Sequence, residues 1–221
     1  MSFTRKLLAW YKRHARVLPW RETRNPYAIL VSEFMLQQTQ VSRVLEYFPR
    51  FMARFPTIGS LAGAGPKAVM EQWDGLGYYA RARNLHRLAR EVTRLHDGRL
   101  PDTPEELQTL PGVGQYTAGA VACFAYEKPV PTVDTNVRRV LTRVFGNAKV
   151  EMRNAELWKV ASRLVPKDGP RAWRFNQALM ELGALVCKAR SPLCPECPVR
   201  SDCRAVRSGI RIHNRRPARP R

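Results

Sequence analysis

The stretch Leu110-Pro-Gly-Val-Gly-Gln-Tyr-Thr-Ala118 joins a short helix predicted over 103–109 to a small-residue helix predicted over 115–126. Gly112 and Gly114 can adopt backbone angles that are closed to other residues, so the turn can expose successive amide N–H groups. Together with the positive end of the second helix, the amides of Gly112, Val113 and Gly114 suit a DNA phosphate. A bare glycine pair indicates no more than a tight corner, but the full stretch in so basic a chain favours a helix-hairpin-helix.

Composition sets the class of partner. The chain has 221 residues, enough for one large domain or two small ones with a hydrophobic core. Its 38 basic residues exceed its 18 acidic residues, which gives a net charge of +20 and favours nucleic acid as a partner. No apolar run reaches the roughly eighteen residues of a membrane span, and the basic, amphipathic start lacks a signal-peptide core. We therefore expect a cytoplasmic protein with no membrane partner, nucleoid-associated if the source is bacterial or archaeal.

Helical periodicity dominates the chain, and no segment alternates as a strand would. Asn25-Pro26 is a typical helix start, and the helix that follows is expected to run to about Gln40. An apolar stripe begins at Tyr79, and the other faces of that helix, solvated or lining a nucleic-acid groove, carry Arg81, Arg83, Arg87, Arg90 and Arg94. Further helices are predicted over 42–54, 133–145, 153–165 and 170–186. The sequence therefore predicts an all-α fold.

Two carboxylates stand out by their surroundings. Glu33 is the only acid in the apolar stretch 28–36, and in a helix it lies beside residues that should face a core. Burial disfavours the charged form of a carboxyl group, so Glu33 is either a satisfied buried acid or a protonatable one. Asp134 begins the helix predicted over 133–145, where an ordinary N-cap is the first interpretation.

Four of the five cysteines crowd near the end of the chain as Cys187-x6-Cys194-x2-Cys197-x5-Cys203. The fifth, Cys123, is expected to be a small core residue. Four thiolates at this spacing can hold zinc or an iron–sulfur cluster, and the spacing alone leaves both open. In an intracellular protein, this clustering favours a metal site over disulfides.

Several separated motifs together resemble one family. They are SEFMLQQTQV, GLGYYARARNLHRLA, LPGVGQYTAGA followed by VDTNVRRVL, and the cysteine cluster. The chain is similar, over roughly residues 4–205, to the helix-hairpin-helix (HhH-GPD) base-excision DNA glycosylases. Within them it is most similar to the adenine DNA glycosylases of the MutY type.

The resemblance implies a bilobal all-α glycosylase fold, with a six-helix barrel lobe and an iron–sulfur cluster lobe. Residues 1–20 would form an N-terminal helix packed with the cluster lobe, and 21–125 the barrel lobe with the helix-hairpin-helix. Residues 126–205 would form the cluster lobe, in which the four cysteines bind a [4Fe–4S] cluster, and 206–221 a basic, disordered tail. The implied partner is double-stranded DNA containing a mispair or damaged base, bound between the lobes by a monomer.

The resemblance also implies residue roles. Glu33 matches the acid that protonates the leaving adenine, Asp134 the ionised carboxylate that stabilises the sugar cation, and Tyr116 the tyrosine beside it. Asn136 would hold Asp134 in place. Residues around the extruded base would be Trp20, Arg21 and Glu181. Residues that contact or wedge into DNA would be Gln37, Gln38, Thr39, Leu76, Tyr78, Gly112, Val113 and Gly114.

The resemblance leaves the substrate open. Relatives that also cut the DNA backbone carry lysine at position 116, so Tyr116 implies a monofunctional glycosylase acting on adenine opposite 8-oxoguanine or guanine. MutY-type enzymes usually have a further C-terminal domain that reads 8-oxoguanine, and only residues 204–221 follow Cys203. A thymine/uracil mismatch glycosylase acting opposite guanine is therefore the alternative. A non-catalytic iron–sulfur DNA-binding protein would not need Glu33, Tyr116 and Asp134 together.

Overall fold

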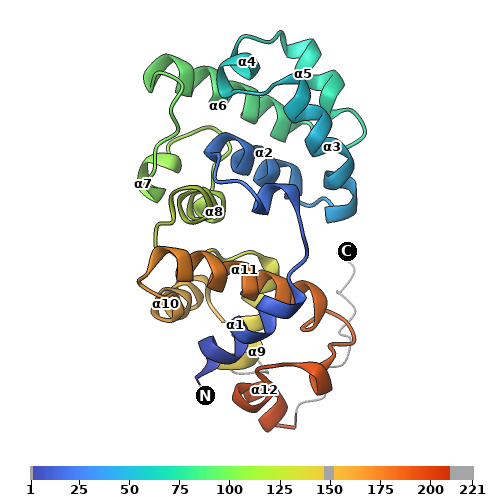
Figure 1. The fold of residues 1–221 in the computed structure, drawn as a ribbon, viewed down its shortest axis with the longest axis vertical. Helices are drawn as coiled ribbons and strands as arrows, with labels where there is room; N and C mark the ends of the chain where they lie inside the picture. Colours follow the sequence, from blue (N-terminus) through green and yellow to red (C-terminus); the bar gives the residue numbers. More distant parts are fainter. Residues whose placement is uncertain (1, 147–151, 210–221) are drawn as a thin grey trace, which may run out of the picture. The chain divides into compact units, whose positions relative to one another are not determined.

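The computed structural model describes residues 2–146 and 152–209, and the described chain contains helices and no strands (Figure 1). The all-α prediction is therefore confirmed. The chain divides into two compact units, one of residues 17–128 and the other of residues 1–16 together with 129–221. In the described part of the chain, no helix is both long and apolar enough to cross a membrane.

The unit of residues 17–128 is built around one buried helix, α2. Its elements are η1 (Pro19–Arg21), α2 (Pro26–Leu36), α3 (Val41–Arg54), α4 (Ile58–Ala62), α5 (Pro66–Trp73), α6 (Ala80–Leu95), α7 (Pro104–Leu107) and α8 (Gln115–Tyr126). Every residue of α2 from Tyr27 to Met35 is buried, because this helix is apolar on all sides and packs against α3, α6 and α8.

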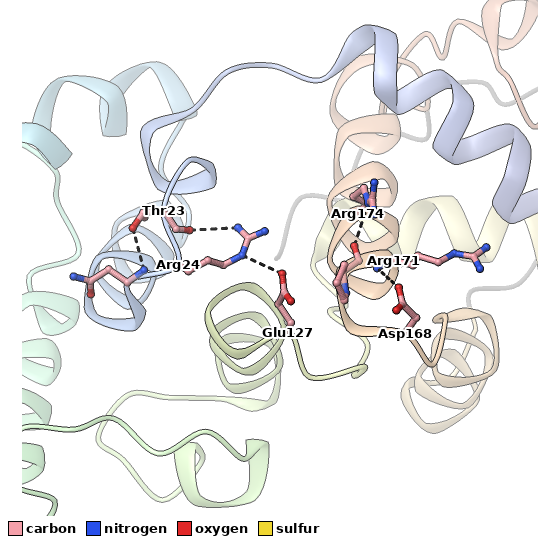
Figure 2. A network of polar contacts seen from close by, with 8 residues as sticks. Thr23, Arg24, Glu127, Asp168, Arg171 and Arg174 are labelled. Atoms are coloured by element: carbon pink, nitrogen blue, oxygen red, sulfur yellow. Dashed lines mark hydrogen bonds and ion pairs between the residues drawn. The ribbon is translucent and has the colours of Figure 1, made fainter.

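The start of α2 is fixed by polar side chains. The Asn25 side chain accepts hydrogen bonds from the backbone N–H groups of Tyr27 (2.9 Å) and Ala28 (3.2 Å), and Pro26 occupies the first helical position. Figure 2 shows the preceding residues, where Arg24 donates to Glu127, the C-cap of α8. The predicted start of this helix is therefore confirmed by its cap.

The second unit packs α11 (Gly169–Leu185) against α1 (Phe3–His14) and α9 (Thr135–Phe145). The phenyl ring of Phe3 lies edge-on to those of Phe145 and Phe175, with centroids 5.0 and 6.5 Å apart. The Asp168 side chain caps α11 by accepting from the Arg171 N–H (Figure 2). The remaining elements are α10 (Asn154–Leu164), η2 (Cys194–Glu196), η3 (Arg200–Asp202) and α12 (Arg204–Arg207).

The structure differs from the sequence prediction in several places. The helix expected to reach Gln40 ends at Leu36, because Gln38 adopts a left-handed conformation with φ of 55°. The short helices α4 and α5 were not predicted. The tail expected over 206–221 overlaps the last two residues of α12, which ends at Arg207. Residues 210–221 of the expected tail lie outside the described residues.

Candidate functional site

Glu33 lies in the last turns of α2 and is 3% exposed. Its neighbours in sequence, Ser32 and Phe34, are also buried, so the carboxyl group occupies the apolar setting that the sequence predicts. A helix that is buried on all sides fixes the orientation of such a side chain much more tightly than a surface helix would. The structure thus provides a rigid, water-poor position for this acid.

The turn between α7 and α8 contains two glycines with different roles. Gly112 has a φ of 77°, and a Cβ atom there would lie 2.8 Å from Cβ of Asn84 and 3.1 Å from Cε1 of Phe34. Gly114, the N-cap of α8, is extended, and a Cβ atom there would meet no atom within 4 Å. The expectation that both glycines use special backbone angles was therefore wrong for Gly114. Gly112 instead lets the turn pack closely on α2 and α6.

The first turn of α8 carries Tyr116, which is half-buried, next to the buried Thr117. The N-cap of this helix is Gly114, which has no side chain that could cap it. The first N–H groups of an α-helix have no acceptor within the helix, and such donors suit an anion such as a phosphate. Trp20 and Arg21 lie in η1. The indole of Trp20 is buried and lies edge-on to the Phe48 ring, with the ring centroids 5.5 Å apart.

Most residues predicted to contact DNA or to wedge into it occupy two turns of this same unit. Gln37, Gln38 and Thr39 follow α2, while Leu76 and Tyr78 precede α6. Leu76 is buried but Tyr78 is 59% exposed, and both Gln38 and Tyr78 have positive φ values (55° and 48°). Positive φ values in two non-glycine residues indicate local backbone strain, which contacts with the surrounding structure must stabilise.

Asp134 is the N-cap of α9, and both carboxylate oxygens are engaged. One accepts from the Val137 N–H at 2.6 Å, and the other accepts from the Asn136 side-chain amide at 2.9 Å. Burial raises the pKa of Asp134 above its ordinary value, whereas these hydrogen bonds and the charge of Arg139 act in the opposite direction. The ordinary N-cap interpretation is correct, and the same geometry holds the carboxylate in one orientation.

Hydrogen bonds link Asp134 to the first cysteine. Asn136 accepts from Arg139 at 2.7 Å, and Arg139 also donates to the carbonyl oxygens of Gly183 and Cys187, both at 2.7 Å. Gly183 has to be small, because a Cβ atom there would lie 2.6 Å from Cβ of Asn136. Sequence reasoning missed Arg139, which has the appearance of a solvated helical arginine.

Glu181 is fully buried in α11 and pairs with Arg16. Arg16 donates to one carboxylate oxygen from its backbone N–H (3.0 Å) and Nε (2.7 Å), and to the other from Nη2 (3.0 Å). This bidentate pairing fixes the carboxylate plane, and the hydrogen bond to Glu181 raises the pKa of Arg16. Sequence reasoning assigned Glu181 but missed Arg16.

Cys187, Cys194, Cys197 and Cys203 line one cavity together with Arg143 and apolar side chains. Arg143 lies 3.4 Å from the Cys187 sulfur, and burial, aided by the other cysteines, raises the pKa of Cys197 to about 11. In the described residues, no three His, Cys, Asp or Glu side chains are grouped as a metal ion would require. A [4Fe–4S] cluster is held by four cysteine thiolates, and the cavity that these four cysteines line would hold such a cluster.

Comparison with protein families gives two matches. Residues 31–163 match the HhH-GPD superfamily of base excision DNA repair proteins. Residues 187–203, the cysteine segment, match the iron–sulfur binding domain of endonuclease III. The second match agrees with the cluster predicted from the resemblance and with the cavity that the four cysteines line.

The chain is also similar to characterised proteins. It is 47% identical to the adenine DNA glycosylase of Rattus norvegicus over 92% of this chain, but it spans only 42% of that relative. It is 50% identical to the adenine DNA glycosylase of Mycolicibacterium smegmatis, covering 93% of this chain and 70% of that relative.

Two solved structures resemble the fold. A thermostable thymine-DNA glycosylase has a TM-score of 0.86 and 32% identity, with 93% of this chain and 95% of that chain covered. A trapped endonuclease III–DNA covalent intermediate has a TM-score of 0.80 and 26% identity, with 94% and 95% covered.

Proposed function

Because the chain belongs to the HhH-GPD superfamily of base excision DNA repair proteins, we propose that it is a monofunctional DNA glycosylase that removes adenine mispaired with 8-oxoguanine or guanine. The observation that carries this proposal is the 50% identity to the Mycolicibacterium smegmatis adenine DNA glycosylase, of which the chain covers 70%. We further propose that it acts as a monomer on double-stranded DNA, in the cytoplasm or nucleoid.

The proposed chemistry divides the work between two carboxyl groups. Hydrolysis of an N-glycosidic bond at neutral pH needs a proton for the departing base and an anion for the cationic sugar. Glu33 donates its proton to the adenine as the bond between C1′ and the base breaks. Asp134 stabilises the sugar cation and Tyr116 supports this step. Water then adds at C1′ and gives its proton to the Glu33 carboxylate, which restores the acid. The apolar burial of Glu33 and the charge-stabilising donors around Asp134 support this assignment.

The remaining predicted residues would bind the substrate. Asn136 positions Asp134, and its 2.9 Å hydrogen bond supports that role. Trp20, Arg21 and Glu181 would contact the extruded base, with Arg16 fixing the Glu181 carboxylate. Gln38, Leu76 and Tyr78 would wedge into the duplex, Gln37 and Thr39 would contact the DNA, and the 112–114 turn would bind a phosphate. Base hydrolysis needs no electron transfer, so the [4Fe–4S] cluster would have a structural role, in which the four cysteines that bind it join four positions of the chain.

A single panel of duplexes tests the proposal. Each duplex carries A, T or U opposite guanine or 8-oxoguanine, and strand cleavage is scored with and without alkali. We expect release of adenine, cleavage only after alkali, and little covalent trapping by borohydride, because Tyr116 cannot form a Schiff base. The Glu33→Gln variant is the negative control. Efficient trapping, or cleavage without alkali, would contradict a monofunctional reaction.

One observation favours a second candidate, a thymine/uracil mismatch glycosylase. A thermostable thymine-DNA glycosylase has a TM-score of 0.86 to this chain at 32% identity, and the chain covers 95% of it. The same panel separates the two, because release of thymine or uracil opposite guanine, without release of adenine, would establish this candidate instead. No release of any base would refute both.

A further inference from the structure

Arg81 occupies a position that its sequence pattern does not predict. It lies in the first turn of α6 among exposed arginines, yet it is only 7% exposed. Burial lowers the pKa of its guanidinium group, and removing this charge from water is costly unless hydrogen bonds replace the lost solvent. The contacts that replace the solvent therefore show what the residue is used for.

One nitrogen of the guanidinium group binds the end of α2. Arg81 Nη1 donates to the carbonyl oxygens of Phe34 (3.0 Å), Met35 (2.7 Å) and Gln37. These carbonyls have lost their helical partners, and they lie at the negative end of the α2 dipole. Arg81 thus fixes both the end of the helix that carries Glu33 and the start of the 37–39 turn.

The other terminal nitrogen binds the turn before α6. Arg81 Nη2 donates to the carbonyl oxygens of Leu76 (3.3 Å) and Gly77 (3.0 Å). The guanidinium carbon also lies 5.4 Å from the ring centroids of both Tyr78 in this turn and Trp73 at the end of α5, so the side chain packs against two aromatic rings. One planar side chain therefore joins two turns that are about forty residues apart in the sequence.

These two turns carry the residues assigned to the DNA wedge. Each contains a non-glycine residue with positive φ, Gln38 and Tyr78, and such a conformation persists only where neighbouring contacts hold it. We propose that Arg81 is a positioning residue, which locks the 37–39 and 76–78 turns in the arrangement that unstacks the target base. This inference rests on the proposed glycosylase function and adds to it the step that Arg81 serves.

The test uses Arg81→Lys, with Arg83→Lys as the matched control. Lysine keeps the charge but cannot fork between two sets of carbonyl oxygens. Arg83 is exposed two residues further along the same helix, so the identical substitution there removes no such contact. Thermal unfolding and circular dichroism of the full chain establish that both variants are folded.

Two substrates separate base extrusion from base hydrolysis. One duplex holds adenine paired opposite 8-oxoguanine, and the other holds the same adenine in a single-nucleotide bulge, where little unstacking is needed. For Arg81→Lys we expect the single-turnover rate to fall roughly 10- to 100-fold on the paired substrate, because small misplacements of positioning groups cost this much. On the bulge the rate should fall less than about threefold, since the unstacking that the wedge assists has been bypassed. Arg83→Lys should match the wild-type protein on both substrates.

The outcomes are distinguishable. An equal loss on both substrates would overturn the proposal, because Arg81 would then serve the fold or the chemical step. An unchanged rate on both substrates would overturn it as well. If the wild-type protein releases no adenine from either substrate, the proposed function fails rather than the role of Arg81. In that case the binding of the wild-type protein and of Arg81→Lys to the two duplexes decides the role of Arg81. Arg81→Lys should bind the paired duplex more weakly than the wild-type protein does, and the bulged duplex equally well.

Discussion

Asp134 combines a structural role with a proposed chemical role in one side chain. As the N-cap of α9 it accepts from the Val137 N–H, and as the proposed anion it accepts from Asn136. Burial alone would favour the protonated form, and the donors together with Arg139 favour the ionised form. The ionised form is the one that can stabilise a sugar cation, so we expect these donors to matter for activity as well as for the helix.

The pH dependence of base release should therefore respond to Asn136. Its hydrogen bond to the carboxylate lowers the pKa of Asp134, so Asn136→Ala should raise that pKa further. Activity is lost as Asp134 becomes protonated, and the acidic limb of the single-turnover rate profile should move to higher pH. Near the limb the rate should fall severalfold, as expected for loss of a hydrogen bond to a charged group.

A matched control is available in the same unit. Asn154 accepts an exposed hydrogen bond from Arg138 at 2.7 Å, and Asn154→Ala should leave the profile unchanged. An acidic limb that stays in place in Asn136→Ala, or moves to lower pH, would contradict the role assigned to Asn136.

Single residues differ in how well the sequence reveals them. Glu33 stood out because one acid interrupts an apolar run, and it is indeed buried. Arg81 and Arg139 were not singled out, because an arginine in a helix usually faces solvent. Their acceptors include backbone carbonyl oxygens, which every residue carries, so no side-chain pattern marks such a site.

At the scale of elements, helices with a clear apolar stripe and a cap signal were predicted well. The predicted range 115–126 coincides with α8, and α9, α10 and α11 begin or end within two residues of their predicted bounds. The predicted end of α2 was wrong because the chain turns at Gln38, where the sequence has neither glycine nor proline to mark a turn. The short helices α4 and α5 offer too few residues for a periodic pattern to emerge.

The hairpin between α7 and α8 gives a prediction at this scale. Gly112→Ala should lower the free energy of unfolding by about 1–3 kcal/mol, because its positive φ and the 2.8 Å approach to Asn84 leave no room for a methyl group. It should also weaken duplex binding by displacing the turn. Gly114→Ala should change stability by less than about 0.5 kcal/mol, since it is extended and faces open space.

Denaturant unfolding and duplex binding at one fixed salt concentration measure both effects. Equal effects of the two substitutions would show that the difference between the two glycines does not matter. A stable Gly112→Ala variant would show that α6 can move to accept the methyl group.

At the scale of the whole molecule, the cysteines give the most direct prediction. Freshly purified protein should be brown and hold about four iron and four sulfide ions per chain. Cys197→Ser should lose iron and destabilise the unit containing 129–209, because ligand binding contributes to folding. Cys123→Ala is the control, since Cys123 is buried in α8 of the other unit. Hydrogen exchange resolved along the chain measures the loss in each unit, and a colourless protein with stoichiometric zinc would refute the cluster.

Composition predicted the class of partner at this scale but could not identify the base. The net charge of +20 suits any nucleic acid, and the helix-hairpin-helix suits any duplex. The carboxylates and Tyr116 fit both candidate reactions alike. Which base is removed depends on how the base pocket discriminates, and residue types alone do not encode that discrimination.

The pairing of residues 1–16 with 129–221 has a consequence for synthesis on the ribosome. The apolar face of α1 (Phe3, Leu7, Trp10 and Tyr11) is covered by a unit whose α11 begins only at Gly169. At about 5–20 residues per second, α1 therefore waits roughly 10–30 s for its packing partner. The unit of residues 17–128 is contiguous and can complete its core during this interval. The nascent chain thus carries an uncovered apolar helix ahead of a finished domain, and this is the stage at which a chaperone would have most to protect.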